Sequence, residues 1–171
     1  MMTKIVSGYW HVVDSQAGYT AISREALQLL NLDGLYPRYG FPNDLLINLN
    51  VYDMKVIDVP TRPIYNVGEQ SKIRLYRVVP TIAWLLFRRF FWRLTEKYVI
   101  RDFHPLVFFY FFGGVLFLPG LIMGLYLFYH RVYVGPVVPT SALFPVFLCV
   151  TGLQLLLFAM WFDMDHNKRL K

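Results

Sequence analysis

The sequence contains a single cysteine, Cys149, in 171 residues, and only 16% of its residues are charged. One cysteine can form neither an internal disulfide nor a zinc site built from several thiolates, so a disulfide-stabilised scaffold is excluded. The four histidines are scattered without metal-ligand spacing, and we expect no metal site in this chain. Residues 1–8 lack a basic segment followed by an apolar one, so we expect no cleavable signal.

What the sequence does contain is apolar surface. Hydrophobic residues make up 56% of the chain and aromatic residues 18%, and the mean hydropathy is +0.41. These values exclude an ordinary soluble domain and indicate a membrane protein. The net charge is +6, and the cations gather before the longest apolar run. This pattern favours an anionic membrane surface over nucleic acid as the basic partner.

Two uncharged segments are long enough to cross a bilayer. Residues 105–129 form a run of 25 without charge, about 37 Å as a helix, against a hydrocarbon core of about 30 Å. Residues 141–162 form a second run, and glycine and proline interrupt the short link between them. We therefore expect a transmembrane helical hairpin. Several small residues in the first span would allow a close helix neighbour, although glycine is also common in membrane helices: Gly113, Gly114, Gly120 and Gly124.

The distribution of cations predicts the topology. Five cations precede the first span, three follow the second, and only Arg131 lies in the link. By the positive-inside rule both termini face the cytoplasm, with residues 163–171 as a basic cytoplasmic tail. The expected location is the cytoplasmic membrane, which the chain crosses more than once.

Residues 80–104 are expected to form an amphipathic juxtamembrane helix. Four of its cations recur every four residues and share one face, and aromatic residues fill much of the rest. Such a helix lies in the headgroup plane, where each cation contributes about 1 kcal/mol of attraction to anionic lipid. The alternative is that this face holds the phosphate of a lipid substrate. The expected membrane-surface residues are Arg88, Arg89, Arg93, Lys97 and Arg101.

Residues 1–79 have the mixed charge and turn residues of an α/β domain. We expect a strand at 19–22, a helix capped by Ser23 and ended by Gly34, a second helix that opens at Asn43 or Asp44, and a strand at 55–59. This order of elements fits a mixed α/β layer.

Three clusters carry candidate chemistry. Asp14 precedes the first expected strand, although an aspartate in a turn commonly bonds its own backbone. Asp44 opens a helix beside aromatic residues, where a plain N-cap is the alternative. The loop after residue 59 has three cations suited to phosphate, Arg62, Lys72 and Arg74, although basic loops are more often only solvated.

The order of these clusters is more specific than any one of them. It runs D-x-x-x-G-Y at 14–19, T-A-I-S-R-E-A-L directly after it, Y-G-F-P-N-D at 39–44, V-P at 59–60 and G-E-x-S-K at 68–72. Followed by a basic helix and a two-span hairpin, it resembles the C-terminal half of membrane-bound family-2 glycosyltransferases. These are GT-A-fold enzymes related to dolichol-phosphate mannosyltransferase and polyprenyl-phosphate sugar transferases. The resemblance covers nearly the whole chain from about residue 5.

The resemblance implies transfer of a sugar from a nucleotide sugar to a lipid acceptor, commonly a polyprenyl phosphate, or to a related cell-envelope acceptor, with Mg²⁺ or Mn²⁺ on the diphosphate. Asp14 matches the family's active-site aspartate, Asp44 the acidic position of the acceptor-side helix, and Lys72 and Arg74 the cations near the phosphates. The chemistry agrees, because cations stabilise the leaving diphosphate and a carboxylate can orient or deprotonate the acceptor. Residues 1–79 would then be the C-terminal portion of the GT-A domain.

The chain departs from the family in having no N-terminal half to bind the nucleotide. Its only D-x-D sequence, at 163–165, ends the second span rather than following a strand, and we interpret it as coincidence. We therefore expect a fragment with no complete metal site, inactive alone, that acts with a separate N-terminal half or as a homo-oligomer. The alternative is a non-enzymatic membrane-anchored module that binds lipid or a partner subunit. A channel is disfavoured, because ionisable residues lie only at the ends of the spans.

Overall fold

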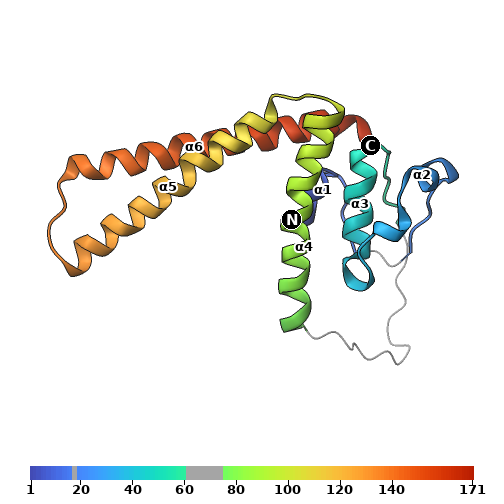
Figure 1. The fold of residues 1–171 in the computed structure, drawn as a ribbon, viewed down its shortest axis with the longest axis horizontal. Coiled ribbons are helices and arrows are strands. Elements are labelled where there is room, and N and C mark those ends of the chain that lie inside the picture. The colour runs from blue at the N-terminus through green and yellow to red at the C-terminus, as the bar shows by residue number, and fades with distance from the viewer. Residues whose placement is uncertain (17–18, 61–74) are drawn as a thin grey trace. The chain divides into compact units, whose positions relative to one another are not determined.

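The computed structural model describes residues 1–16, 19–60 and 75–171, and the chain divides into two compact units. We call Met1–Asp102 together with His166–Lys171 the head, and Phe103–Asp165 the hairpin. Figure 1 shows that helices build both units. The α-helices are α1 (Met2–Ser7), α2 (Arg24–Leu29), α3 (Phe41–Val51), α4 (Leu75–Thr95), α5 (Leu106–Tyr133) and α6 (Pro139–His166). The short elements are the 3₁₀ turns η1 (Leu32–Gly34), η2 (Arg38–Gly40) and η4 (Asn167–Leu170), and the π-helical η3 (Glu96–Arg101).

The prediction of an α/β fold is wrong: throughout the described ranges every regular element is a helix, and none is a strand. The two segments expected as strands, 19–22 and 55–59, are not helical, but neither joins a ladder. A strand needs neighbouring strands because its backbone N–H and C=O groups must find partners, and local sequence preference does not supply them. In the described part of residues 1–79, small helices joined by irregular segments take the place of the expected GT-A portion.

Side chains hold the second of these segments in place. Three hydrogen bonds connect it to the segment after α1, and in each the two residues are 45 positions apart. The constant separation shows that the two segments run in the same direction and meet at every second residue. The bonds run from the Tyr9 hydroxyl to the Met54 carbonyl, from His11 Nε2 to the Val56 carbonyl at 2.7 Å, and from Val13 N to Asp58 Oδ2 at 2.6 Å.

The helix signals of the head are largely confirmed. The Ser23 hydroxyl accepts a hydrogen bond from Ala26 N at 3.2 Å and caps α2 as predicted. That helix ends at Leu29, earlier than expected, and η1 carries the chain on to Gly34. α3 begins at Phe41, before the predicted start, because proline in the first turn lacks only an N–H that would have no helical partner.

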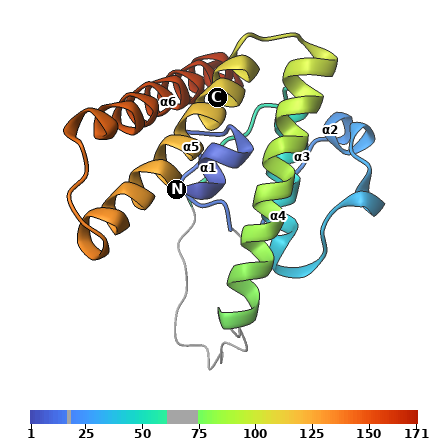
Figure 2. The ribbon, with the colours of Figure 1, turned by 60° about the vertical axis from the view of Figure 1, so that its left-hand side comes forward.

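The core of the head joins residues from distant parts of the sequence. α3 and α4 lie side by side, with α1 against both (Figure 2). A small buried cluster packs Ile47 of α3 against Val6 of α1 and Leu86 of α4. A separate, larger buried cluster, which we call the main cluster, contains Tyr9, Val12, Ala26, Leu30, Leu45, Leu49 and Leu170.

The residues after α6 belong to the head. Leu170 is 3% exposed within the main cluster, and its carbonyl accepts a hydrogen bond from Val56 N at 3.3 Å. The segment 163–171, predicted as a basic tail, therefore ends as a packed element. Both ends of the hairpin are covalently joined to one unit.

The hairpin contains two helices that are able, by length and composition, to cross a membrane. Each helix has 28 residues, about 42 Å, and the most apolar window of each has a mean hydropathy of 2.2. Only 17% of each window is buried, whereas the core helix of a soluble protein would be mostly buried. The predicted span at 141–162 falls within α6, and the one at 105–129 falls within α5 except for Pro105, which is the N-cap.

Glycine permits the close contact between α5 and α6. A Cβ added at Gly152 would lie 2.5 Å from Phe117 N, and one at Gly120 would lie 2.8 Å from Leu148 Cβ. Gly113 also faces α6, whereas Gly114 and Gly124 have open space beside them. Three glycines thus form a packed seam, and the other two are ordinary helix positions.

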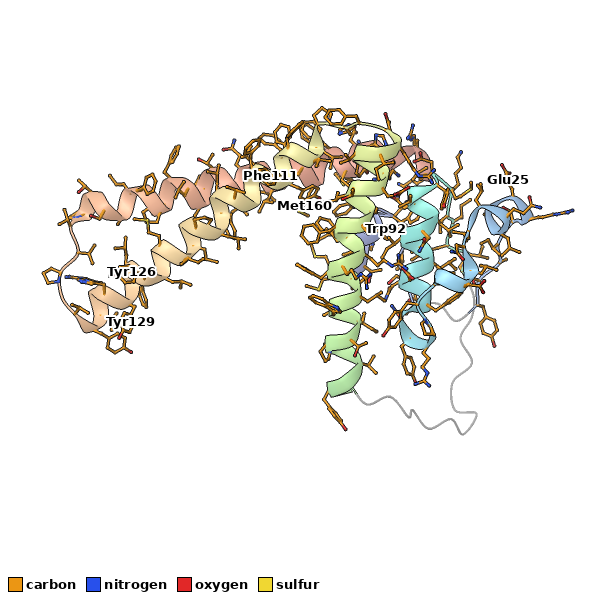
Figure 3. The ribbon with its side chains drawn as sticks, viewed as in Figure 1. Glu25, Trp92, Phe111, Tyr126, Tyr129 and Met160 are labelled. Carbon is orange, nitrogen blue, oxygen red and sulfur yellow. The ribbon has the colours of Figure 1, made fainter. Side chains whose placement is uncertain are left out.

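Aromatic residues lie near both ends of the hairpin. Tyr126 and Tyr129 lie close to the loop (Figure 3), and the Tyr129 ring is 4.9 Å from that of Tyr133. Near the other end, Trp161 stacks on Phe162 with ring centroids 5.9 Å apart. Tyrosine and tryptophan prefer the two membrane interfaces, so this arrangement fits a membrane-crossing hairpin.

Candidate functional site

The first two candidate clusters meet in the head. The Gln16 side chain donates a hydrogen bond to Asn43 Oδ1 at 2.7 Å, which joins the turn at Asp14 to the start of α3. Asp44 is the next residue of the same helix. We call Asp14, Gln16, Asn43 and Asp44 the motif junction. Gln16 and Asn43, 27 positions apart in the sequence, are thus brought together.

Asp14 is exposed and caps its own turn. One carboxylate oxygen accepts a hydrogen bond from Gln16 N at 2.9 Å, which is the turn geometry that we considered as the alternative. Within the described part of the chain this is the only hydrogen bond of the Asp14 carboxylate. The exposed carboxylate remains available to a ligand.

Asp44 is fully buried and forms an ion pair. Arg89 of α4 binds it with two contacts, Nε to Oδ1 at 2.6 Å and Nη2 to Oδ2 at 2.7 Å. Tyr36 N donates to the same carboxylate at 2.8 Å. Gly40 allows α4 to come this close, because a Cβ there would lie 2.7 Å from Leu85. These contacts hold Asp44 between α4 and the segment before α3, and its catalytic role stays a prediction.

Asn43 leaves one polar group of the motif junction unsatisfied. The side chain is fully buried, and its oxygen accepts from Gln16. Its amide nitrogen Nδ2 has no hydrogen-bond partner among the described residues. A buried amide without a partner costs about 1–3 kcal/mol, so this donor marks a strained point of the site.

Two of the five predicted membrane-surface residues are buried instead. Arg93 is fully buried and Lys97 is 2% exposed, and both point into the head. We call these two residues, with Asn50, Tyr98 and Asn167, the basic cluster. A buried cation must be paired or hydrogen-bonded, and the amphipathic pattern alone did not show that protein rather than lipid supplies the partners.

Oxygen atoms of Asn50, Asn167 and Asp53 surround the Lys97 ammonium in the basic cluster. Lys97 Nζ donates to the Asn50 carbonyl at 2.8 Å and to Asn167 Oδ1 at 2.8 Å, and Asp53 lies 3.0 Å away. Asn50 Nδ2 donates to Asn167 Oδ1 at 2.9 Å, and Asn167 donates to the Tyr98 hydroxyl at 2.9 Å. These bonds fasten η3 and η4 to α3.

Arg93 reaches the backbone at the start of the chain. Its Nη2 donates to the Ile5 carbonyl at 3.1 Å, and its Nη1 donates to Asn50 Oδ1 at 3.3 Å. Gly8 is required here, since it has a φ of 77° and a Cβ on it would lie 2.5 Å from Arg93 Nη1. The cation therefore fixes the exit of α1 against α4.

Burial also affects Tyr9, whose side chain is fully buried. Desolvation raises the pKa of the hydroxyl well above its ordinary value; the negative charge of Asp53 adds to this effect, and Arg93 opposes it. The hydroxyl thus stays protonated and donates to the Met54 carbonyl. Its role is structural.

The other predicted site residues differ in their surroundings. Arg88 is exposed, and Arg101 is exposed beside Glu96 at 3.3 Å while its guanidinium lies 4.4 Å from the Tyr52 ring centroid. The phosphate-binding candidates Arg62, Lys72 and Arg74 lie outside the described residues. Among the residues that are described, no group of three acidic, histidine or cysteine side chains is placed to hold a metal ion.

Sequence reasoning missed the asparagines. Asn43, Asn48 and Asn50 lie within one helix, although asparagine is a poor residue for a helix interior. That disagreement was a usable signal of buried polar contacts. Asn167 gave no comparable signal, because its partner Asn50 is 117 positions away.

Comparisons of the chain with protein-family models, with curated proteins and with solved structures find no match. The function therefore has to be argued from the site itself.

Proposed function

We propose that this chain is the membrane-anchored, acceptor-side part of a sugar transferase that acts on a lipid phosphate such as a polyprenyl phosphate. The observation that carries the proposal is the hydrogen bond between Gln16 and Asn43, at 2.7 Å, which joins two of the motifs that resemble membrane-bound glycosyltransferases. The membrane-crossing helices would keep the head beside a lipid acceptor. The nucleotide sugar and its Mg²⁺ or Mn²⁺ would be bound by a separate polypeptide or segment.

Asp14 is the candidate catalytic residue of this proposal. Its exposed carboxylate can orient an already ionised lipid phosphate or deprotonate a hydroxyl acceptor. Asp44 would instead keep the motif junction attached to α4 through its ion pair with Arg89. The two carboxylates thus have separate tasks, which predicts different outcomes when each is replaced.

Replacing Asp14 with asparagine is expected to lower sugar transfer by about 10²-fold or more, because a lost acid–base or orienting group acts mainly in the transition state. The amide oxygen can still accept the bond from Gln16 N, so thermal stability should change little. The assay uses membranes of source cells whose own gene is replaced by the variant. Radiolabelled nucleotide sugars and polyprenyl phosphate are added, and labelled lipid is extracted and counted.

The matched control is Asp33→Asn, an exposed carboxylate in the turn η1. Asp53 is unsuitable as a control, because it pairs with Lys97 and Arg169. Transfer should survive in the control. Equal transfer by the Asp14 variant and the parent, with a lower melting temperature for the variant, would assign Asp14 to the turn alone and remove the enzymatic proposal.

The second candidate function is a non-enzymatic membrane-anchored module. Asp44 and the basic cluster form ion pairs and hydrogen bonds with other residues of the head, and such contacts stabilise the fold. This observation favours the non-enzymatic module. This candidate would be favoured if the membranes described above formed the same amount of labelled lipid with and without this gene. Purified alone in detergent with donor, acceptor and metal, the chain should release no nucleotide diphosphate under either candidate.

Both termini are proposed to face the cytoplasm. Both termini belong to the head, which supports their lying on the same side of the membrane. The excess of cations beside them supports the cytoplasmic side. We expect reporter fusions after Lys171 and within the loop at 135–138 to give opposite locations. A C-terminal reporter active outside the cytoplasm would contradict this topology.

A further inference from the structure

α4 has an exposed face opposite to Arg89 and Arg93. Trp84, Phe87 and Phe91 lie on this face and are 67%, 56% and 52% exposed. Arg88 is exposed between them. The spacing of three and four residues places these side chains on one side of the helix. We call Trp84, Phe87, Arg88 and Phe91 the aromatic stripe.

The rings of the aromatic stripe are packed on one another. Trp84 stacks on Phe87 with centroids 5.8 Å apart, and Phe87 meets Phe91 edge-on at 5.0 Å. They form a continuous apolar surface rather than isolated exposed residues. Contiguous apolar surface of this kind marks an interaction site. Figure 3 shows side chains of α4 projecting both toward α3 and away from it.

The connection to the hairpin indicates what covers this surface. Four residues, 102–105, connect η3 to α5, so only a short segment of chain separates α4 and η3 from the first membrane-crossing helix in the sequence. Tryptophan and phenylalanine beside an arginine suit the boundary between headgroups and acyl chains, where the rings enter the apolar layer and the cation meets phosphate. The chemistry of the aromatic stripe therefore matches that of a bilayer interface.

We propose that the aromatic stripe of α4 docks on the lipid bilayer that holds the hairpin, with its rings below the headgroups and Arg88 at the lipid phosphates. This reverses the expected orientation of the helix, since Arg93 and Lys97 face the head interior and the rings face lipid. The inference does not depend on sugar transfer, and it would stand if the module were non-enzymatic.

Spin labels test the docking in the full chain. On a Cys149→Ser background, Phe87→Cys and Phe91→Cys are labelled with a nitroxide and reconstituted in liposomes with anionic lipid. We expect collisions with oxygen, which concentrates in the apolar layer, to exceed collisions with a water-soluble nickel chelate. The matched control is Leu27→Cys on α2, which is 41% exposed outside the stripe and should show the opposite preference.

Each contrary outcome has a distinct signature. Greater access for nickel at positions 87 and 91 would show a face in water and overturn the proposal. Spin–spin broadening that disappears on dilution with unlabelled chain would assign the face to a second copy, and exclusion of both reagents without broadening would assign it to another protein contact. Either result would also overturn it.

A second measurement avoids the label. Brominated lipids quench tryptophan that lies in the bilayer, so Trp84→Phe should remove a quenchable part of the emission. Trp92→Phe is the comparison on the same helix, at a partly buried position, and it should remove much less. Equal losses of quenchable emission in the two variants would contradict the docking.

Discussion

Replacing Asp44 with asparagine is expected to lower the free energy of unfolding of the head by about 2–3 kcal/mol. Removing one member of a buried ion pair costs about 3–5 kcal/mol, and Arg89 is 21% exposed, so water recovers part of this loss. For a unit of this size such a change lowers the melting temperature by roughly 10 °C or more. Thermal unfolding in detergent, followed by circular dichroism, measures it.

Two variants accompany this experiment. Glu96→Gln breaks the exposed pair with Arg101 and should change stability by less than about 1 kcal/mol. The double variant Asp44→Leu with Arg89→Met removes both charges, so it should be more stable than Asp44→Asn alone. An unchanged melting temperature for Asp44→Asn would contradict the ion pair between α3 and α4.

Replacing Gly152 with isoleucine is expected to separate α5 from α6. Its added Cβ would meet the backbone of Phe117 at 2.5 Å and 2.8 Å, and backbone atoms of a helix cannot move aside as a flexible side chain can. Overpacking of a tight contact costs about 1–3 kcal/mol or more. We expect faster proteolysis of the hairpin in detergent and a lower temperature at which the chain aggregates.

Gly124→Ile is the matched control in the same hairpin. Gly124 has open space beside it, and the substitution adds the same side chain to the surface of α5. It should leave both measurements close to those of the parent. If the Gly124 variant fails as strongly as the Gly152 variant, the seam is not where the structure places it.

Local signals were the predictable part of this molecule. The Ser23 cap and the two apolar spans depend on residues close in sequence, and both appear where expected. The strand at 55–59 was wrong because alternating apolar residues show local preference but not a partner strand. The local sequence pattern therefore predicted a segment correctly only where the interacting residues lie within that segment.

The orientation of α4 depends on distant residues. Cations and rings both repeat along this helix, so its sequence allows either face to turn inward. The choice follows from Asp44 and the oxygens of Asn50 and Asn167, which receive the cations inside the head. Asn167 comes after both membrane helices, and no local pattern could connect it to Lys97.

The return of the chain after α6 sets an order of assembly. Leu170 completes the core that contains Tyr9 and Ala26, and Asn167 completes the basic cluster. During synthesis these residues emerge only after both helices of the hairpin have been made. The head would therefore reach its final packing only after the hairpin has been synthesised, and until then its early-made segments would remain exposed to chaperones and proteases.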